Sequence, residues 1–83
     1  MTALDPSRRY LVPVAPLGLP GEPDHTHLAV MSWNTRIEEW LTWSAICGRS
    51  TAQGPLAVGT AATCPDCAAW RPVYEAMLGQ VVA

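Results

Sequence analysis

The sequence predicts a small α+β domain, in which a β-hairpin and a C-terminal helix follow an extended proline-rich arm. Three observations support this fold class: prolines gather near the N-terminus, apolar and polar residues alternate through the middle, and a helix-start signal lies near residue 65. A chain of 83 residues buries a small core and often needs additional stabilisation, such as a disulfide or a structural metal.

The arm is assigned to residues 1–24, which hold five of the eight prolines. Proline fixes φ at about −65° and favours polyproline II or turns. The same segment is rich in apolar residues, so it is either a disordered tail or an arm that packs on its own domain or on a partner. We expect residues 25–83 to form the folded domain.

The hairpin is predicted from two alternating segments, residues 25–33 and 38–47, with a turn at Asn34 between them. A competing interpretation is a short helix over 36–42, because Thr35 and Glu38 form a capping-box pattern. We favour the hairpin. Of the four tryptophans, Trp43 and Trp70 are the best candidates for the core.

The helix is predicted to begin at Pro65, where a first-turn proline is tolerated and Asp66 suits the positive end of the helix dipole. Pro72 lacks the N–H of a helical hydrogen bond and should kink or divide the helix. Gly79 is the expected stop.

Two cysteines, Cys64 and Cys67, stand in the segment TCPDC at this predicted helix start. In a redox pair, Cys64 would be the nucleophile and Cys67 the resolving thiol, but this chemistry needs a strand–helix–strand scaffold that the sequence does not show. An odd total of three cysteines excludes a complete disulfide framework. A metal site is therefore the favoured interpretation.

A metal site needs further ligands, and Cys47 and the segment DHTH supply them. Gly48 after Cys47 allows a turn around the sulfur, whereas Ser44 stands where a complete Cys-x-x-Cys-Gly knuckle would have its first cysteine. We prefer His27 to His25 as the fourth ligand because His27 lies within the apolar run. Asp24 could orient the imidazole.

This arrangement, HL…TWSAICGRS…TCPDC, resembles a group of small zinc-finger proteins from actinobacteria and their phages. The resemblance covers about residues 27–67 and implies zinc held by His27, Cys47, Cys64 and Cys67, in a fold like a treble clef or zinc ribbon. A Cys₃His zinc site is closed to water, so we expect no enzyme activity. An iron–sulfur cluster could use the same ligands, but zinc is their commoner occupant.

The charge balance argues against nucleic-acid binding as the main function. The net charge is −2, and all five cations are arginines without a basic stripe. A nucleic-acid-binding regulator using Arg36, Arg49 and Arg71 around the zinc is the alternative, and a thiol oxidoreductase is a third.

The leading functional expectation is a protein-interaction module or adaptor in a phage or actinobacterial regulatory assembly. Its partner would contact the N-terminal arm and the turn flanked by Trp33 and Trp40, because exposed tryptophans are enriched at binding hot spots. No run of residues approaches the length of a membrane span, and no signal-peptide core is present. We therefore expect a cytoplasmic protein with no membrane partner.

Overall fold

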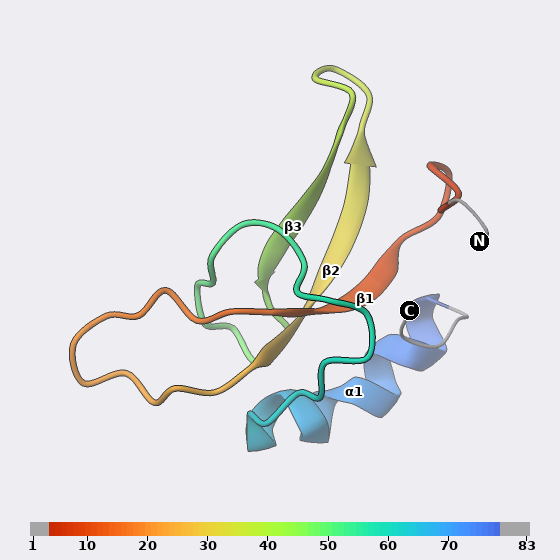
Figure 1. The fold of residues 1–83 in the computed structure, drawn as a ribbon. Coiled ribbons are helices and arrows are strands. Elements are labelled where there is room, and N and C mark those ends of the chain that lie inside the picture. The colour runs from red at the N-terminus through yellow and green to blue at the C-terminus, as the bar shows by residue number, and fades with distance from the viewer. Residues whose placement is uncertain (1–3, 79–83) are drawn as a thin grey trace.

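A three-stranded antiparallel sheet and one C-terminal helix make up the fold (Figure 1). This computed structural model describes residues 4–78. The strands are β1 (Tyr10–Val14), β2 (His27–Asn34) and β3 (Glu39–Ala45), in the spatial order β1-β2-β3, and the helix is α1 (Pro65–Leu78). The small α+β class, with strands before a terminal helix, is confirmed.

Strand β1 was not expected from the sequence, which assigned its residues to the arm. It pairs antiparallel with β2, from Tyr10 opposite Met31 to Val14 opposite His27. Pro13 is tolerated because β1 is an edge strand, where a missing N–H removes no ladder bond on the open side. Part of the arm thus packs on its own domain, while the division of the chain after residue 24 stays a prediction.

The predicted hairpin is confirmed, because β2 and β3 pair antiparallel and the competing helix over 36–42 does not form. The Asn34 side chain accepts hydrogen bonds from the backbone N–H groups of Arg36 (2.9 Å) and Ile37 (3.4 Å), which closes the turn. Glu38 takes a positive φ of 54° before β3 begins. The capping-box residues therefore belong to a turn that satisfies its own backbone groups.

A β-bulge interrupts the pairing of β2 with β3. Met31 pairs with Thr42 but Ala29 pairs with Ala45, which leaves Trp43 and Ser44 opposite the single residue Val30. The alternation expected for this strand fails at that point. Thr42 and Ala45 are both buried although they are three residues apart.

The sheet buries residues on both faces. The core on the helix side contains Leu11, Leu28, Ile46, Cys64 and Cys67, with Tyr74 and Leu78 of α1 packed against it. The other core contains Val12, Val14, Ala29 and Met31, with Tyr10 and Trp40 packed against it. Backbone bonds from Leu56 to Pro13 and from Ala52 to Ala15 hold the long loop after β3 against β1.

The expected placement of Trp43 and Trp70 in the core is wrong, because their side chains are 61% and 50% exposed. Trp43 lies at the edge of a cavity that it shares with Val30, Ser32 and Tyr74 rather than in the core, and Trp70 lies on the outer side of α1. Trp33 and Trp40 are instead half-buried and pack edge to face, with 5.5 Å between ring centroids. Tyr10 extends this packing, at 5.9 Å from Trp40.

Helix α1 runs through Pro72 as one helix, so the expected division there does not occur. The missing N–H of Pro72 deprives the carbonyl of Ala68 of a partner, but Ala68 is exposed and water can replace it. The expected stop at Gly79 lies outside the described residues. Within the described part of the chain, no helix is long and apolar enough to cross a membrane.

Candidate metal centre

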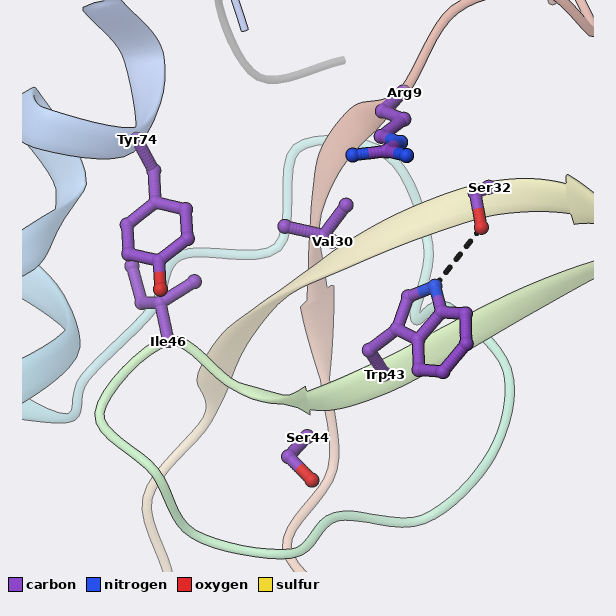
Figure 2. A pocket seen from close by; sticks show the side chains of 7 residues that line it. All are labelled: Arg9, Val30, Ser32, Trp43, Ser44, Ile46 and Tyr74. Carbon is purple, nitrogen blue, oxygen red and sulfur yellow. Dashed lines mark hydrogen bonds between the residues drawn. The ribbon is translucent and has the colours of Figure 1, made fainter. Parts of the chain in front are cut away.

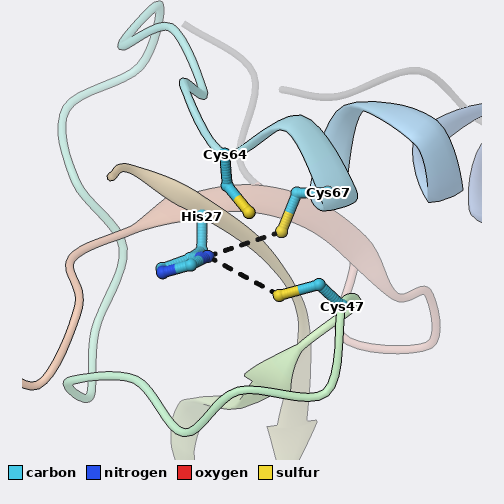
Figure 3. A group of neighbouring side chains, drawn as sticks. All are labelled: His27, Cys47, Cys64 and Cys67. Carbon is cyan, nitrogen blue, oxygen red and sulfur yellow. Dashed lines mark hydrogen bonds between the residues drawn. The ribbon is translucent and has the colours of Figure 1, made fainter. Parts of the chain in front are cut away.

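The four residues predicted as ligands lie together at the open end of the hairpin, meaning the end away from its turn (Figure 3). The candidate ligand atoms of His27, Cys47, Cys64 and Cys67 all lie within 4.8 Å of one another. Three of these residues are buried and Cys47 is half-buried. Segments far apart in the chain therefore bring together a donor set that could hold a metal ion.

His27 and Cys47 meet because the strands carry them to opposite positions. The pairing of Ala29 with Ala45, continued by two residues, places His27 opposite Cys47. A bond from the Ile46 N–H to the Leu28 carbonyl, at 2.9 Å, shows that this register persists beyond β3. The bulge matters here, because a register slip of one residue turns a side chain to the other face.

Cys64 and Cys67 are positioned by the start of α1. The Cys64 carbonyl accepts the first helical bond, from the Ala68 N–H at 3.0 Å, so Cys64 is the N-cap residue. The segment is tied to the start of β2 through Thr26, whose carbonyl accepts from Thr63 (2.9 Å) and Cys64 (3.1 Å). Thr63 Oγ1 in turn accepts a bond from the Thr26 N–H at 2.9 Å.

The protein environment acts differently on the two helix cysteines. Burial raises the pKa of Cys64, but hydrogen bonds from the backbone N–H groups of Cys67 and Asp66 outweigh it, so its pKa is lowered overall. Burial raises the pKa of Cys67 to about 12, although the Leu28 N–H lies 3.4 Å from its sulfur. A coordinated cation would deprotonate such a thiol outright.

His27 presents one ring nitrogen to the cysteines. Its Nδ1 lies 3.6 Å from the sulfur of Cys67 and 3.7 Å from that of Cys47 (Figure 3). Burial lowers the pKa of His27, while the charge of Glu22 acts in the opposite direction. The neutral imidazole favoured by burial is the form that binds metals.

Two of the distances between candidate ligand atoms match a tetrahedral metal site. With Zn–S bonds of about 2.3 Å and Zn–N bonds of about 2.0–2.1 Å, a tetrahedron has S···N edges of about 3.5–3.6 Å. The two measured Nδ1–sulfur distances, 3.6 and 3.7 Å, are close to that value. The sulfurs of Cys47 and Cys67 are thus spaced from the imidazole as two ligands of one tetrahedral ion would be, and the sulfur of Cys64 lies within 4.8 Å of all three atoms.

The other residues considered from the sequence lie outside the cluster. His25 is half-buried and lines a cavity of about 170 Å³ beside it, together with Arg49 and Asp66. Ser44 is exposed in the bulge, and Asp24 is exposed ahead of β2. His25 precedes β2, so the shared strand face expected for the two histidines does not exist.

Sequence reasoning missed Glu22, whose Oε1 atom is buried without a hydrogen-bond partner among residues 4–78. The Nε2 atom of His27 is in the same situation. No motif marks a glutamate at this position, since it lies in a proline-rich loop five residues before His27.

The surroundings of Cys64 and Cys67 differ from those of a strand–helix–strand redox site. In the described part of the chain all strand pairs are antiparallel, and α1 follows a long loop rather than a strand. Comparisons with protein-family models, with curated proteins and with solved structures found no match. The resemblance to small zinc-finger proteins therefore stays an expectation, and the buried His-Cys-Cys-Cys cluster is the finding on which a functional proposal can be built.

Proposed function

We propose that this chain binds one structural zinc ion through His27, Cys47, Cys64 and Cys67, and that the zinc-stabilised domain serves as a protein-interaction module. The observation that carries the zinc proposal is the buried Cys₃His set with near-tetrahedral S···N distances. Two ligands from the hairpin and two from a helix start form a treble-clef-like arrangement. All four positions of the tetrahedron are protein atoms, so the site has no position for a reacting water.

Metal analysis and spectroscopy of the purified protein test the zinc proposal. We expect about one zinc ion per chain and a colourless protein, as a site with four protein ligands requires. A brown protein that contains iron and sulfide would replace zinc by an iron–sulfur cluster. Stoichiometric zinc that persists in Cys47→Ser and Cys67→Ser variants would contradict the assigned ligands.

The proposal of protein binding rests on a groove between the sheet and α1, which we call the Trp43 groove (Figure 2). It has a volume of about 330 Å³ and is lined by Arg9, Val30, Ser32, Trp43, Ser44, Ile46 and Tyr74. Trp43 Nε1 donates a hydrogen bond to Ser32 Oγ at 2.9 Å, which fixes the orientation of the exposed indole. Oriented aromatic side chains beside an apolar floor are typical of binding hot spots.

The charge of the Trp43 groove indicates the kind of partner. Arg9 is the only charged residue that lines the groove, and it forms no ion pair with any residue between 4 and 78. An apolar protein segment with an acidic group at one end would match this lining. The partner that we propose is therefore a protein segment that combines apolar and acidic side chains.

Helix α1 adds a second apolar surface. Trp70, Val73 and Met77 are 50%, 47% and 66% exposed and recur at helical spacing on its outer side. The arm also exposes Leu17 and Leu19. Exposed apolar side chains gathered in this way are typical of interaction surfaces. Contact through the arm and through Trp33 and Trp40 remains part of the proposal, although these two tryptophans also pack on each other.

The alternative, nucleic-acid binding by arginines around the zinc, has less support. Arg36 lies in the hairpin turn, and the seven steps of β2 between His27 and Asn34 span about 23 Å. Arg71 is paired with Glu75 at 3.2 Å. Arg49 alone of the three lines the cavity beside the cluster.

Selection from a library of random short peptides tests the proposed partner chemistry. We expect zinc-loaded protein to enrich peptides with an acidic residue next to apolar ones, and binding to be weakened by Arg9→Ala and by Trp43→Ala. Val58→Ala is the control, because it removes an exposed apolar side chain that does not line the groove. The proposal fails if the enriched peptides lack acidic residues, or if a salt-dependent complex with DNA forms instead.

A further inference from the structure

The imidazole of His27 has two nitrogens, and only one of them faces the cysteines. Nδ1 lies within 3.7 Å of the sulfurs of Cys47 and Cys67. The other nitrogen, Nε2, is buried and has no hydrogen-bond partner among the described residues. The whole residue is 1% exposed, so bulk water does not replace the missing partner.

Metal ligation through Nδ1 determines what Nε2 needs. The neutral imidazole then carries its proton on Nε2, and this N–H must find an acceptor. Ligating histidines almost always donate this second N–H to a carboxylate, a backbone carbonyl or a water, which fixes the tautomer and the ring orientation. The four ligands alone therefore provide no hydrogen-bond acceptor for the Nε2–H of His27.

Glu22 lacks a hydrogen-bond donor within residues 4–78, just as His27 Nε2–H lacks an acceptor. Its Oε1 atom is buried and lacks a donor among the described residues. Pro23, the next residue in the chain, lines the same cavity as His27, and the charge of Glu22 raises the pKa of His27 against the effect of burial. A turn holds Glu22 in this place, with its N–H bonded to the Leu19 carbonyl at 3.0 Å and Gly21 at a positive φ of 79°.

Neither nearby alternative matches Nε2 as well. Asp24 is exposed, and water satisfies an exposed carboxylate. His25 lines the adjoining cavity and is half-buried. Of the buried side-chain oxygen and nitrogen atoms in the described chain, Glu22 Oε1 and His27 Nε2 are the two without a partner, one an acceptor and the other a donor in the ligating tautomer.

We propose that Glu22 is the positioning residue of the metal centre: its carboxylate accepts a hydrogen bond from His27 Nε2–H when Nδ1 is a ligand. This inference rests on the proposed metal binding. In the structure no hydrogen bond joins the two side chains, so metal loading must bring the Glu22 carboxylate within hydrogen-bond distance of Nε2. The proline-rich loop before β2 then becomes part of the site rather than a passive connection.

Zinc affinity of Glu22 variants tests this role in the full-length protein, by competition with a chelating indicator. Glu22→Leu removes the acceptor and should weaken zinc binding by about 10–100-fold, the usual effect of losing such a partner. Glu22→Gln keeps an acceptor oxygen and should restore most of the affinity. Asp24→Leu and Asp24→Gln are the matched controls and should bind zinc like the wild type.

Nuclear magnetic resonance of the His27 ring supplies a readout that a general loss of stability does not mimic. The Nε2 proton should be visible and slow to exchange in zinc-loaded wild type and Asp24→Leu, and lost to exchange in Glu22→Leu. Equal zinc affinity of Glu22→Leu and Asp24→Leu, with the Nε2 proton retained in both, would overturn the inference. Wild-type protein that binds no zinc would instead overturn the proposed metal site.

Discussion

The two ends of the β2–β3 hairpin are stabilised in different ways. The closed end is held by the turn around Asn34 and by the packing of Tyr10, Trp40 and Trp33. The open end gathers candidate ligands from β2, the turn after β3 and the start of α1, and its buried polar atoms are incompletely satisfied. Under the proposed zinc binding, the closed end folds from its own contacts, whereas the open end depends on an added ion.

The largest effect is expected when the open end loses a ligand. Cys67→Ser, or zinc removal by a chelator, should cost on the order of 10 kcal/mol of metal-coupled stability. Hydrogen exchange should then show α1 unprotected, since Cys67 is its only buried residue within the described part, while amides near the hairpin turn keep more protection. Full protection of α1 in the zinc-free protein would contradict the proposed division between the two ends.

The bulge that joins the two ends gives the next prediction. One serine inserted after Ser44 should turn Cys47 to the other face of the sheet and abolish zinc binding. Deletion of Ser44 should make the strand regular, leave Cys47 opposite His27, and preserve about one zinc ion per chain. Zinc analysis of the two variants checks this, and zinc retention in the insertion variant would show that register does not position Cys47.

The closed end should respond to Trp40→Ala in stability but not in zinc content. Trp40 is half-buried against the core of Val12 and Met31, so we expect a loss of about 2 kcal/mol, below the roughly 3–5 typical of fully buried tryptophan. Trp43→Ala is the control, because its exposed ring should cost less than about 0.5 kcal/mol. Denaturant unfolding of the zinc-loaded proteins distinguishes them, and equal losses would refute the assigned packing.

The smallest effect should come from the hairpin turn. Asn34→Ala removes the acceptor for two backbone N–H groups and should cost about 1 kcal/mol. Asn34→Asp keeps that acceptor and should cost less. A thermal unfolding series checks the order of the three proteins, and an alanine variant as stable as the wild type would show that the turn bonds contribute nothing.

The sequence predicted the residues of the candidate site better than it predicted the packing of the sheet. His27, Cys47, Cys64 and Cys67 could be named because few residue types bind metals and their spacing limits the choices. The hairpin and the helix followed from alternation and from the helix-start signal at Pro65. These signals depend on residues near one another in the chain.

The missed features depend on contacts between distant segments. Strand β1 was hidden by its proline, which an edge position tolerates, and nothing local marks an edge. The bulge at Trp43 and Ser44 broke the expected alternation of β3, because it changes which face the following side chains meet. Glu22 could not be found because its role depends on where a turn places it relative to His27.

The central claim, that a single zinc ion holds the open end of the hairpin through His27 and three cysteines, is tested most directly by zinc content in a matched pair of histidine variants. We predict about one zinc ion per chain in the wild type and in His25→Ala, as a four-ligand site requires, and a loss of tightly bound zinc in His27→Ala. Equal zinc content in His25→Ala and His27→Ala, or a wild-type protein that folds without any metal, would contradict the account.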